Sequence, residues 1–211
     1  MGGDAVKIDR VVTSGKFELD GGSWDVDNNV WVVGDDDEAV VIDAAHQAEP
    51  IVAAVADRTV RAILCTHAHN DHINVATELA QALDAPIRLH PADEVLWSAL
   101  YPDTRYEPLH DRERIPVADS EIEILHTPGH SPGAVSLYLA SEKTVFTGDT
   151  LFQGGPGATG RSFSSFPTII ESIRTRLLTL PADTTVLTGH GNPTTIGAEA
   201  PHLPEWIKRG H

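Results

Sequence analysis

The sequence predicts an α/β fold in which strands and helices alternate along the chain. First, short apolar runs recur over the whole length, bounded by the glycine, proline or charged residues that favour turns. Second, several runs lead into segments whose apolar residues fall at helical spacing, as the run 60–65 leads into residues 73–83. Third, neither a linker nor a repeat interrupts this order, so residues 1–211 are expected to form a single domain.

Before residue 101, each element has its own signal. Apolar runs predict strands at residues 6–12, 29–33, 39–43, 60–65 and 87–89. Helical spacing predicts helices at residues 50–55, 73–83 and 91–100, and the first and last of these begin with proline, which is favoured in the first turn. Gly21-Gly22 is an expected turn, and the acidic segment 34–38 is an expected hairpin tip.

After residue 100 the elements follow the same pattern. Apolar or alternating runs predict strands at residues 121–125, 134–140, 143–146 and 184–188, the middle two as a hairpin. Thr168-x-x-Glu171 resembles a capping box, which predicts the start of a helix that buries Ile169, Ile173, Leu177 and Leu180. Residues 199–208 are an expected terminal helix or extension. Residues 101–119 and 153–161 have no period and are expected loops, of which the first could cover a functional site.

The charge balance limits the partners that the protein can have. Lys and Arg total 15 against 31 Asp and Glu, so the formal net charge is −16. Because phosphate binding requires a basic surface, nucleic acid is not an expected partner, and anionic membranes are excluded for the same reason. No apolar run approaches the roughly 20 residues of a membrane-spanning helix.

The termini and the cysteine content indicate a cytoplasmic protein. Met1-Gly2-Gly3-Asp4 lacks the basic and apolar segments of a secretion signal. Cys65 is the one cysteine and stands in an apolar run, so we expect a buried, unreactive thiol.

The densest group of chemically active residues is Thr66-His67-Ala68-His69-Asn70-Asp71-His72, between a predicted strand and a predicted helix. In an extended His-x-His segment both imidazoles point to the same side. Asp71 and His72 then add a carboxylate and a third imidazole. These groups are ligands for zinc, iron and manganese. The alternative is a solvated polar loop, but no structural requirement explains this order of residues, so a metal site is favoured.

Three further strand ends carry a glycine beside a residue that can bind metal: Gly129-His130, Gly148-Asp149 and Gly189-His190. Glycine allows a sharp turn and a close approach of the backbone to a ligand. Each pair alone could be an ordinary turn. Together with the histidine-rich segment they favour one shared metal centre.

These residues sort by counting into two sites. One cation can take His67, His69 and His130, and a second can take Asp71, His72 and His190. Asp149 remains, and a carboxylate bridges two cations well. We therefore expect two metals, roughly 3.5–4 Å apart, that share Asp149 and a hydroxide. Zinc is favoured over iron or manganese, and Asp71 and Asp149 are the carboxylates expected to take part in catalysis.

A metal-bound water has its pKa lowered to about 7, which suits hydrolysis of an acyl group. The other histidines have no comparable context and are expected to be surface or structural residues: His46, His90, His110, His126, His202 and His211.

The motifs resemble those of the metallo-β-lactamase superfamily. They are His67-x-His69-x-Asp71-His72, Thr127-Pro128-Gly129-His130, Gly148-Asp149-Thr150-Leu151-Phe152 and Gly189-His190-Gly191. The continuation Gly189-His190-Gly191-x-x-Thr194-Thr195-Ile196-Gly197-x-Glu199 resembles the glyoxalase II-like hydrolases in particular. The resemblance covers almost the whole chain. It implies an αββα sandwich of two mixed sheets flanked by helices, with the metals at one edge between the sheets, and the same ligand assignment.

The resemblance also implies a substrate class. Glyoxalase II carries a further helical domain with basic residues that bind glutathione, and this chain ends soon after Glu199. The expected activity is therefore hydrolysis of a thioester of a low-molecular-weight thiol. Residues around the histidines and at 154–166 look like actinobacterial members of the family, so an acyl-mycothiol is a candidate. Arg161 is either a substrate contact or an exposed structural residue.

Other functions remain open. A persulfide dioxygenase resembles the same scaffold but uses one iron, which His67, His130 and Asp149 would hold. The retained set Asp71, His72 and His190 favours the hydrolase instead. A lactonase would use the same two metals. A binding module without activity is disfavoured because no ligand is missing, and the oligomeric state is left open.

Overall fold

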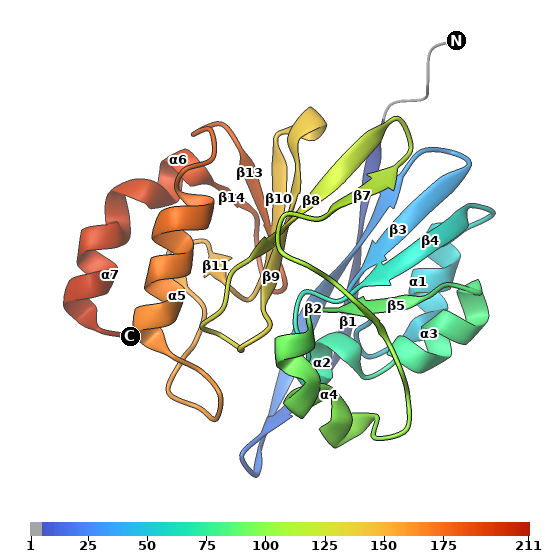
Figure 1. Cartoon of the computed structure of the whole chain (residues 1–211), viewed down its shortest axis with the longest axis horizontal. Coiled ribbons are helices and arrows are strands. Elements are labelled where there is room, and N and C mark those ends of the chain that lie inside the picture. Colours follow the sequence, from blue (N-terminus) through green and yellow to red (C-terminus); the bar gives the residue numbers. More distant parts are fainter. Residues whose placement is uncertain (1–5) are drawn as a thin grey trace.

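The protein is described by a computed structural model that covers residues 6–211. Two six-stranded sheets pack face to face, and helices lie on the outer face of each (Figure 1). This confirms the predicted αββα sandwich. The expected lack of a secretion signal at Met1-Gly2-Gly3-Asp4 lies outside the described residues. In the described part of the chain, no helix is both long and apolar enough to cross a membrane.

The first sheet has the strand order β1-β2-β3-β4-β5-β6. Its strands are β1 (Lys7–Leu19), β2 (Gly22–Gly34), β3 (Glu38–Ile42), β4 (Thr59–Leu64), β5 (Ile87–Leu89) and β6 (Glu107–Pro108). β1, β2 and β3 are antiparallel, and β3 to β6 are parallel. The helices on this side of the molecule are α1 (Ala48–Val55), α2 (Asn70–Ile73), α3 (Ala76–Leu83) and α4 (Glu94–Leu100), the last preceded by the 3₁₀ turn η1 (Pro91–Asp93).

The second sheet has the order β14-β13-β10-β9-β8-β7. Its strands are β7 (Arg114–Val117), β8 (Ser120–His126), β9 (Val135–Leu139), β10 (Thr144–Gly148), β13 (Thr185–Thr188) and β14 (Thr194–Thr195). Only β10 and β13 run parallel among these described neighbours. The remaining elements are η2 (Ala140–Glu142), the small hairpin β11 (Leu151–Phe152) and β12 (Gly155–Pro156), α5 (Phe166–Ser172), the π-helical turn η3 (Ile173–Leu177), α6 (Ile196–Glu199), η4 (Ala200–His202) and α7 (Leu203–Arg209).

The core consists of three apolar layers, which the strand period explains. In β2, Trp31 and Val33 point between the two sheets, while Val30 and Val32 point to the helices of the first side. Successive side chains of a strand face opposite ways, so a strand buried on both faces is apolar throughout. A third layer joins the second sheet to α5 and α7, where Trp206 is fully buried.

The predicted first strand was too short. β1 runs to Leu19 and pairs with β2 along its whole length. The outer part of this hairpin projects beyond the sandwich (Figure 1), and many of its residues are exposed or half-buried. One face of the outer part of β1 is half-buried, and Phe17 and Leu19 are its apolar members beside Gly15, so the sequence shows only a weak alternation there.

The prediction of one continuous helix over residues 73–83 was wrong. Residue 73 ends α2, and α3 begins only at Ala76. The β3–α1 connection holds the break between them. The Val75 amide donates to the Ala44 carbonyl at 3.2 Å, and the Asn74 side-chain oxygen accepts from the His46 amide at 2.6 Å. These long-range bonds replace the local ones that a continuous helix would need.

The predicted capping box was also wrong. The N-cap of α5 is Ser165, whose hydroxyl accepts from the Thr168 amide at 3.4 Å, while Glu171 pairs with Arg174. Pro167 in the first turn supports this earlier start. Residues 101–119 are not a single loop, since they contain β6 and β7 and pass from the first sheet to the second. β14 follows the strand that was expected to be the last.

Candidate metal centre

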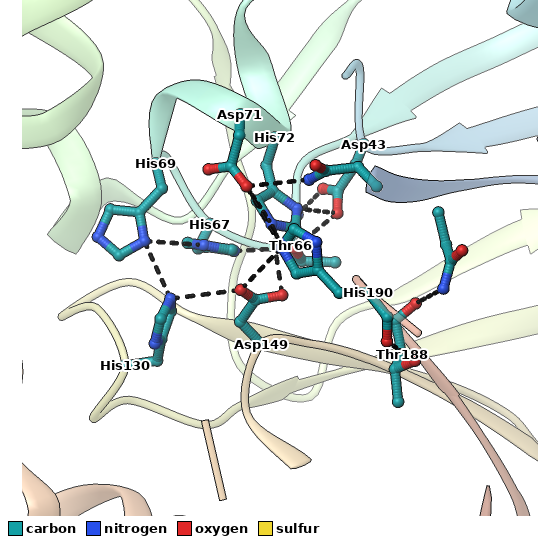
Figure 2. Close-up of polar contacts among 12 residues, drawn as sticks. Asp43, Thr66, His67, His69, Asp71, His72, His130, Asp149, Thr188 and His190 are labelled. Carbon is teal, nitrogen blue, oxygen red and sulfur yellow. Dashed lines mark hydrogen bonds and ion pairs between the residues drawn. The ribbon is translucent and has the colours of Figure 1, made fainter. Parts of the chain in front are cut away.

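The seven predicted ligands converge at one edge of the sandwich (Figure 2). Residues 66–72 lie between β4 and α3, His130 lies in the β8–β9 connection, Asp149 follows β10 and His190 follows β13. All four segments leave their strands at the same edge, because β4 belongs to the parallel part of one sheet and β10 and β13 are parallel in the other. Two sheets thus supply ligands to a single region.

The first group consists of three imidazoles. His69 Nδ1 lies 3.1 Å from His67 Nε2 and 3.0 Å from His130 Nε2. In a tetrahedral zinc site with Zn–N distances of 2.0–2.1 Å, ligand nitrogens lie roughly 3.3 Å apart. The spacing of these nitrogens therefore fits one metal ion between them.

The second group contains Asp71, His72 and His190. His190 Nε2 lies 3.2 Å from His72 Nε2 and 3.3 Å from Asp71 Oδ2. Its members are buried, except for His190, which is about a quarter exposed. This group forms the second candidate metal position.

Asp149 lies between the two groups. Its Oδ2 is 3.6 Å from His130 Nε2 and 3.3 Å from His190 Nε2, and its Oδ1 is 3.3 Å from His72 Nε2. Asp149 also forms a third group with His67 and His72. One carboxylate thus contacts members of both groups, as the count from the sequence suggested.

Four of the five histidines have their outer ring nitrogen next to an oxygen. His67 Nδ1 faces Thr66 Oγ1, His72 Nδ1 faces Asp43 Oδ2, His130 Nδ1 faces the Ala158 carbonyl and His190 Nδ1 faces the Asp27 carbonyl, at 2.8–3.1 Å. A proton on Nδ1 leaves the Nε2 lone pair free for a metal, and such outer partners are typical of metal-binding histidines. His69 differs, because its Nδ1 faces the group and its Nε2 has no hydrogen-bond partner among residues 6–211.

Two functional residues were missed in the sequence. Asp43 accepts bonds from the Thr66 amide at 2.7 Å and the Thr66 hydroxyl at 2.9 Å, in addition to its contact with His72. Asn28 donates to Asp71 Oδ2 at 3.1 Å and contacts His46 Nε2 at 2.8 Å. The position of Asp43 directly after a buried strand was a usable signal, whereas nothing local marked Asn28.

The electrostatics of the two groups differ. Burial lowers the pKa of His69 to about 3 and that of His67 well below its usual value, so both are neutral. Burial also opposes protonation of His72 and His190, but it is outweighed there by carboxylates. Asp149, Asp71 and Asp43 raise the pKa of His72 well above its usual value, and Asp149 and Asp71 raise that of His190 to about 10. The second group therefore attracts positive charge strongly.

The buried carboxylates also fit a cation. Asp71 Oδ1 is buried without a hydrogen-bond partner in the described part of the chain, and Asp149 Oδ1 approaches His72 without hydrogen-bond geometry. Unpaired buried polar atoms are rare in folded proteins and usually indicate a function. The clusters of histidine and aspartate side chains suit a dinuclear metal site.

Glycine is required where the strands reach the centre. A Cβ on Gly189 would lie 2.3 Å from Asp149 Oδ1 and 2.7 Å from His72 Cε1. Gly148 has φ +48°, and a Cβ there would lie 2.5 Å from Thr66 Oγ1. The corners predicted from the sequence are therefore positions where no larger residue fits.

A cavity of about 220 Å³ opens onto the centre. Besides Asp71, His130, Asp149 and His190, its lining is apolar: Phe17, Val26, Phe152 and Ala158. The expectation that residues 101–119 cover the site was wrong, since none of them lines this cavity. The β1–β2 hairpin takes that place, because its outer part projects over this edge.

Arg161 lies at the hairpin and is exposed. Its guanidinium carbon is 4.0 Å from the centre of the Trp24 ring, and Asp20 accepts from the Ser162 amide at 3.0 Å. Of the histidines expected to be structural, His46 hydrogen-bonds to Asn28 behind the centre, and His90 stacks on His126 at 4.0 Å. His110, His202 and His211 are exposed.

Comparison with known proteins agrees with this geometry. Residues 24–190 match the family model of the metallo-beta-lactamase superfamily. Hydroxyacylglutathione hydrolase GloC of Haemophilus influenzae is 34% identical over 190 residues, which are 81% of this chain and 89% of that protein. The chain belongs to the metallo-β-lactamase superfamily, whose fold and clustered ligands define a metal-dependent hydrolase.

Two solved structures are similar over most of the chain. TTHA1623, solved in a di-iron-bound form, is 33% identical with a TM-score of 0.75, and the match covers 83% of this chain and 93% of that one. BLEG-1, a B3 metallo-beta-lactamase, is 30% identical with a TM-score of 0.75, and the match covers 92% and 99%.

Proposed function

We propose that this protein hydrolyses thioesters of a low-molecular-weight thiol with two divalent metal ions. The observation that carries the proposal is a pair of ligand groups joined by Asp149 at the base of a small, largely apolar cavity. The name of the Haemophilus influenzae relative, a hydroxyacylglutathione hydrolase, supports the thioester class.

In this proposal His67, His69 and His130 hold one metal, Asp71, His72 and His190 hold the other, and Asp149 contacts both. Metals bound there supply a hydroxide nucleophile at neutral pH and stabilise developing negative charge. Asp43 orients His72 and Thr66, and Asn28 orients Asp71.

The residues around the cavity favour a thioester over an ester with a poor leaving group. The titratable residues in its described lining are Asp71, His130, Asp149 and His190, which are all assigned to the metals. Within the described part of the chain, the cavity lining offers no further titratable group that could act as a general acid. A thiolate with a pKa of about 8.5 can leave without one.

The cavity also limits the acyl group. Its volume of about 220 Å³ lies below the range of roughly 300–1,000 Å³ that is usual for ligand pockets. We therefore propose a small acyl group, such as formyl or lactoyl, with the thiol carrier extending outward past the hairpin.

The single-domain organisation and the cytoplasmic location of the protein stay predictions from the sequence.

Zinc is the proposed metal, because imidazole and carboxylate ligands suit it well. The same ligands also suit iron, and the similarity to TTHA1623 in its di-iron-bound form supports iron as the alternative. Elemental analysis of freshly purified protein, run beside a panel of thioesters, a lactone and a β-lactam, tests metal and reaction together. We expect two metals per chain and the highest kcat/KM on a thioester. Protein without metal, or with metal but faster on the lactone or β-lactam, would contradict the proposal.

Alanine variants of the ligands distinguish a persulfide dioxygenase, which needs one iron, from a hydrolase that needs two metals. If one iron sufficed, Asp71→Ala and His190→Ala would affect activity far less than His67→Ala and His130→Ala. We expect comparable losses from all four, because each variant removes a ligand from one of two necessary metals. Oxygen consumption with a thiol persulfide and one iron per chain would reverse this ranking.

A further inference from the structure

A buried carboxylate outside the ligand set joins two of the ligand loops. Asp93 ends η1 and is fully buried. Its Oδ2 accepts from the Ala68 amide at 2.9 Å and from Ser131 Oγ at 2.8 Å, and its Oδ1 accepts from the Gly133 amide at 2.5 Å. Ala68 lies between His67 and His69, and Ser131 directly follows His130.

The two loops joined in this way belong to different sheets. The first follows β4 and the second connects β8 to β9, so pairing within one sheet does not fix their separation. The contact between His69 Nδ1 and His130 Nε2, at 3.0 Å, spans this junction. Besides Asp93, the Val135 amide donates to the Thr66 carbonyl across it at 2.8 Å.

His69 has a particular need for such a connection. It is the ligand histidine whose outer nitrogen has no hydrogen-bond partner within the described residues. Its ring is held by packing against Phe17 at 5.4 Å and by the position of its backbone, which Asp93 fixes at the neighbouring Ala68.

The second loop is shaped to reach Asp93. A Cβ on Gly133 would lie 2.6 Å from the Asp93 amide nitrogen and 2.8 Å from its Cγ. The φ angle of Gly133 is not in the left-handed region, so the glycine is needed for this close approach and not for its own conformation.

We propose that Asp93 is a positioning residue that sets the metal affinity of the His67, His69 and His130 group by fixing the two loops relative to each other. The proposal rests on the proposed metal site. Burying a carboxylate costs free energy of desolvation, and Asp93 forms no ion pair with any residue that the structure describes, so we assign it the alignment of these two loops.

The test is Asp93→Asn. This change keeps the size of the side chain, but its three partners act as donors, so the new amide nitrogen faces a donor. Metal is removed with a chelator, and zinc affinity is measured by competition with a chromophoric chelator. We expect one of the two zinc ions to bind about 10–100-fold more weakly and the other to bind as in the unchanged protein, on the scale of lost outer-shell partners.

Glu199→Gln is the matched control. Glu199 is also a buried carboxylate, and it accepts from the Gly154 amide at 3.0 Å and the Thr194 hydroxyl at 2.6 Å, neither of which belongs to a proposed ligand or directly adjoins one. Metal bound only to the folded state raises Tm, and weaker binding reduces that gain. We expect Asp93→Asn to narrow the Tm difference between zinc-loaded and chelator-treated protein, and Glu199→Gln to lower both values equally.

Gly133→Ala provides a second route if Asp93→Asn does not fold. It moves the His130 loop away from Asp93 and should weaken the same zinc ion. Unchanged zinc binding in the folded variants, with stability lost as in Glu199→Gln, would overturn the proposal. The zinc measurement needs no substrate. If the protein proved not to be a thioesterase, the result for Asp93 would still stand, and if Asp93 proved not to affect zinc binding, the thioesterase proposal would still stand.

Discussion

Asp149 is the residue that links both proposed metal positions, since its two oxygens approach His130, His190 and His72 within 3.6 Å. Asp149→Asn is nearly isosteric, so the fold should be kept, but it removes a negative charge between two cations. We expect kcat to fall at least about a hundredfold, on the scale of losing one electrostatic stabiliser. Turnover, metal content and circular dichroism check this. Near-normal turnover with two bound metals would mean that the bridge is assigned wrongly.

The raised pKa values of His72 and His190 lead us to expect that metal binding releases protons. After burial is offset by the carboxylates, the pKa of His190 is about 10 and that of His72 is raised well above its usual value. His190 therefore carries a proton at pH 7.5 in chelator-treated protein, and the raised pKa of His72 favours its protonated form, whereas a metal ligand must be neutral. We expect at least one proton per chain to be released from these imidazoles when both sites fill, in addition to the proton that a bound water loses in becoming hydroxide, and an affinity that rises with pH toward 10.

Calorimetric titration in buffers of different ionisation enthalpy measures this release. His69 supplies an internal comparison, because burial lowers its pKa to about 3 and it has no proton to lose at that pH. Binding of both metals without proton release would show that the second group does not coordinate through these imidazoles.

At the scale of residues, the sequence predicted the groups that carry chemistry but not those that hold them. The histidines and aspartates stood in short segments with distinctive spacing. Asp43, Asn28 and Asp93 act through bonds to residues distant in the sequence, such as Asp93 to Gly133 at a separation of 40 positions. A local pattern shows at most that such a residue stands at a strand end, as Asp43 does, and does not show which distant residue it contacts.

At the scale of elements, the strands buried on both faces were predicted well, because continuous apolar runs mark them. The misplaced elements have long-range causes. α2 and α3 are separated by bonds to the β3–α1 connection, and β1 continues into a hairpin that no layer covers. The β1–β2 hairpin covers the candidate metal centre, which had been expected of residues 101–119.

The hairpin should contribute to substrate binding. Phe17 lines the cavity, stacks on Trp24 at 5.6 Å and lies 5.4 Å from the His69 ring, and Arg161 covers Trp24. Trp24→Ala removes the support of both neighbours. Cation–π contacts are worth about 0.5–2 kcal/mol, so we expect KM for the thioester to rise about 2–30-fold with little change in kcat.

Val12→Ala is the control, because Val12 is an exposed apolar residue of β1, the strand that also carries Phe17, and is not part of the cavity lining. It should leave both parameters unchanged. An equal rise in KM for both variants would indicate a general loosening of β1 and no specific role of the aromatic pair.

At the scale of the whole molecule, the four-layer architecture was predictable through the resemblance of its motifs, which fix where several strands must end. The strand order and the parallel pairing of β10 with β13 were not, because nothing in the local sequence selects one neighbour over another. The net charge, in contrast, is read directly from the sequence and acts on every approaching ligand.

That charge leads to the last prediction, which concerns the thiol carrier. A formal charge of −16 should repel glutathione, which brings two carboxylates, more than mycothiol, a cysteinyl sugar conjugate that has none. We expect kcat/KM for an acyl-mycothiol to exceed that for the same acyl-glutathione at least about tenfold at low salt. Because salt screens the field over about 10 Å at 0.1 M, the difference should shrink as ionic strength rises. Equal or faster use of the glutathione ester at low salt would refute the charge argument while leaving the hydrolase assignment in place.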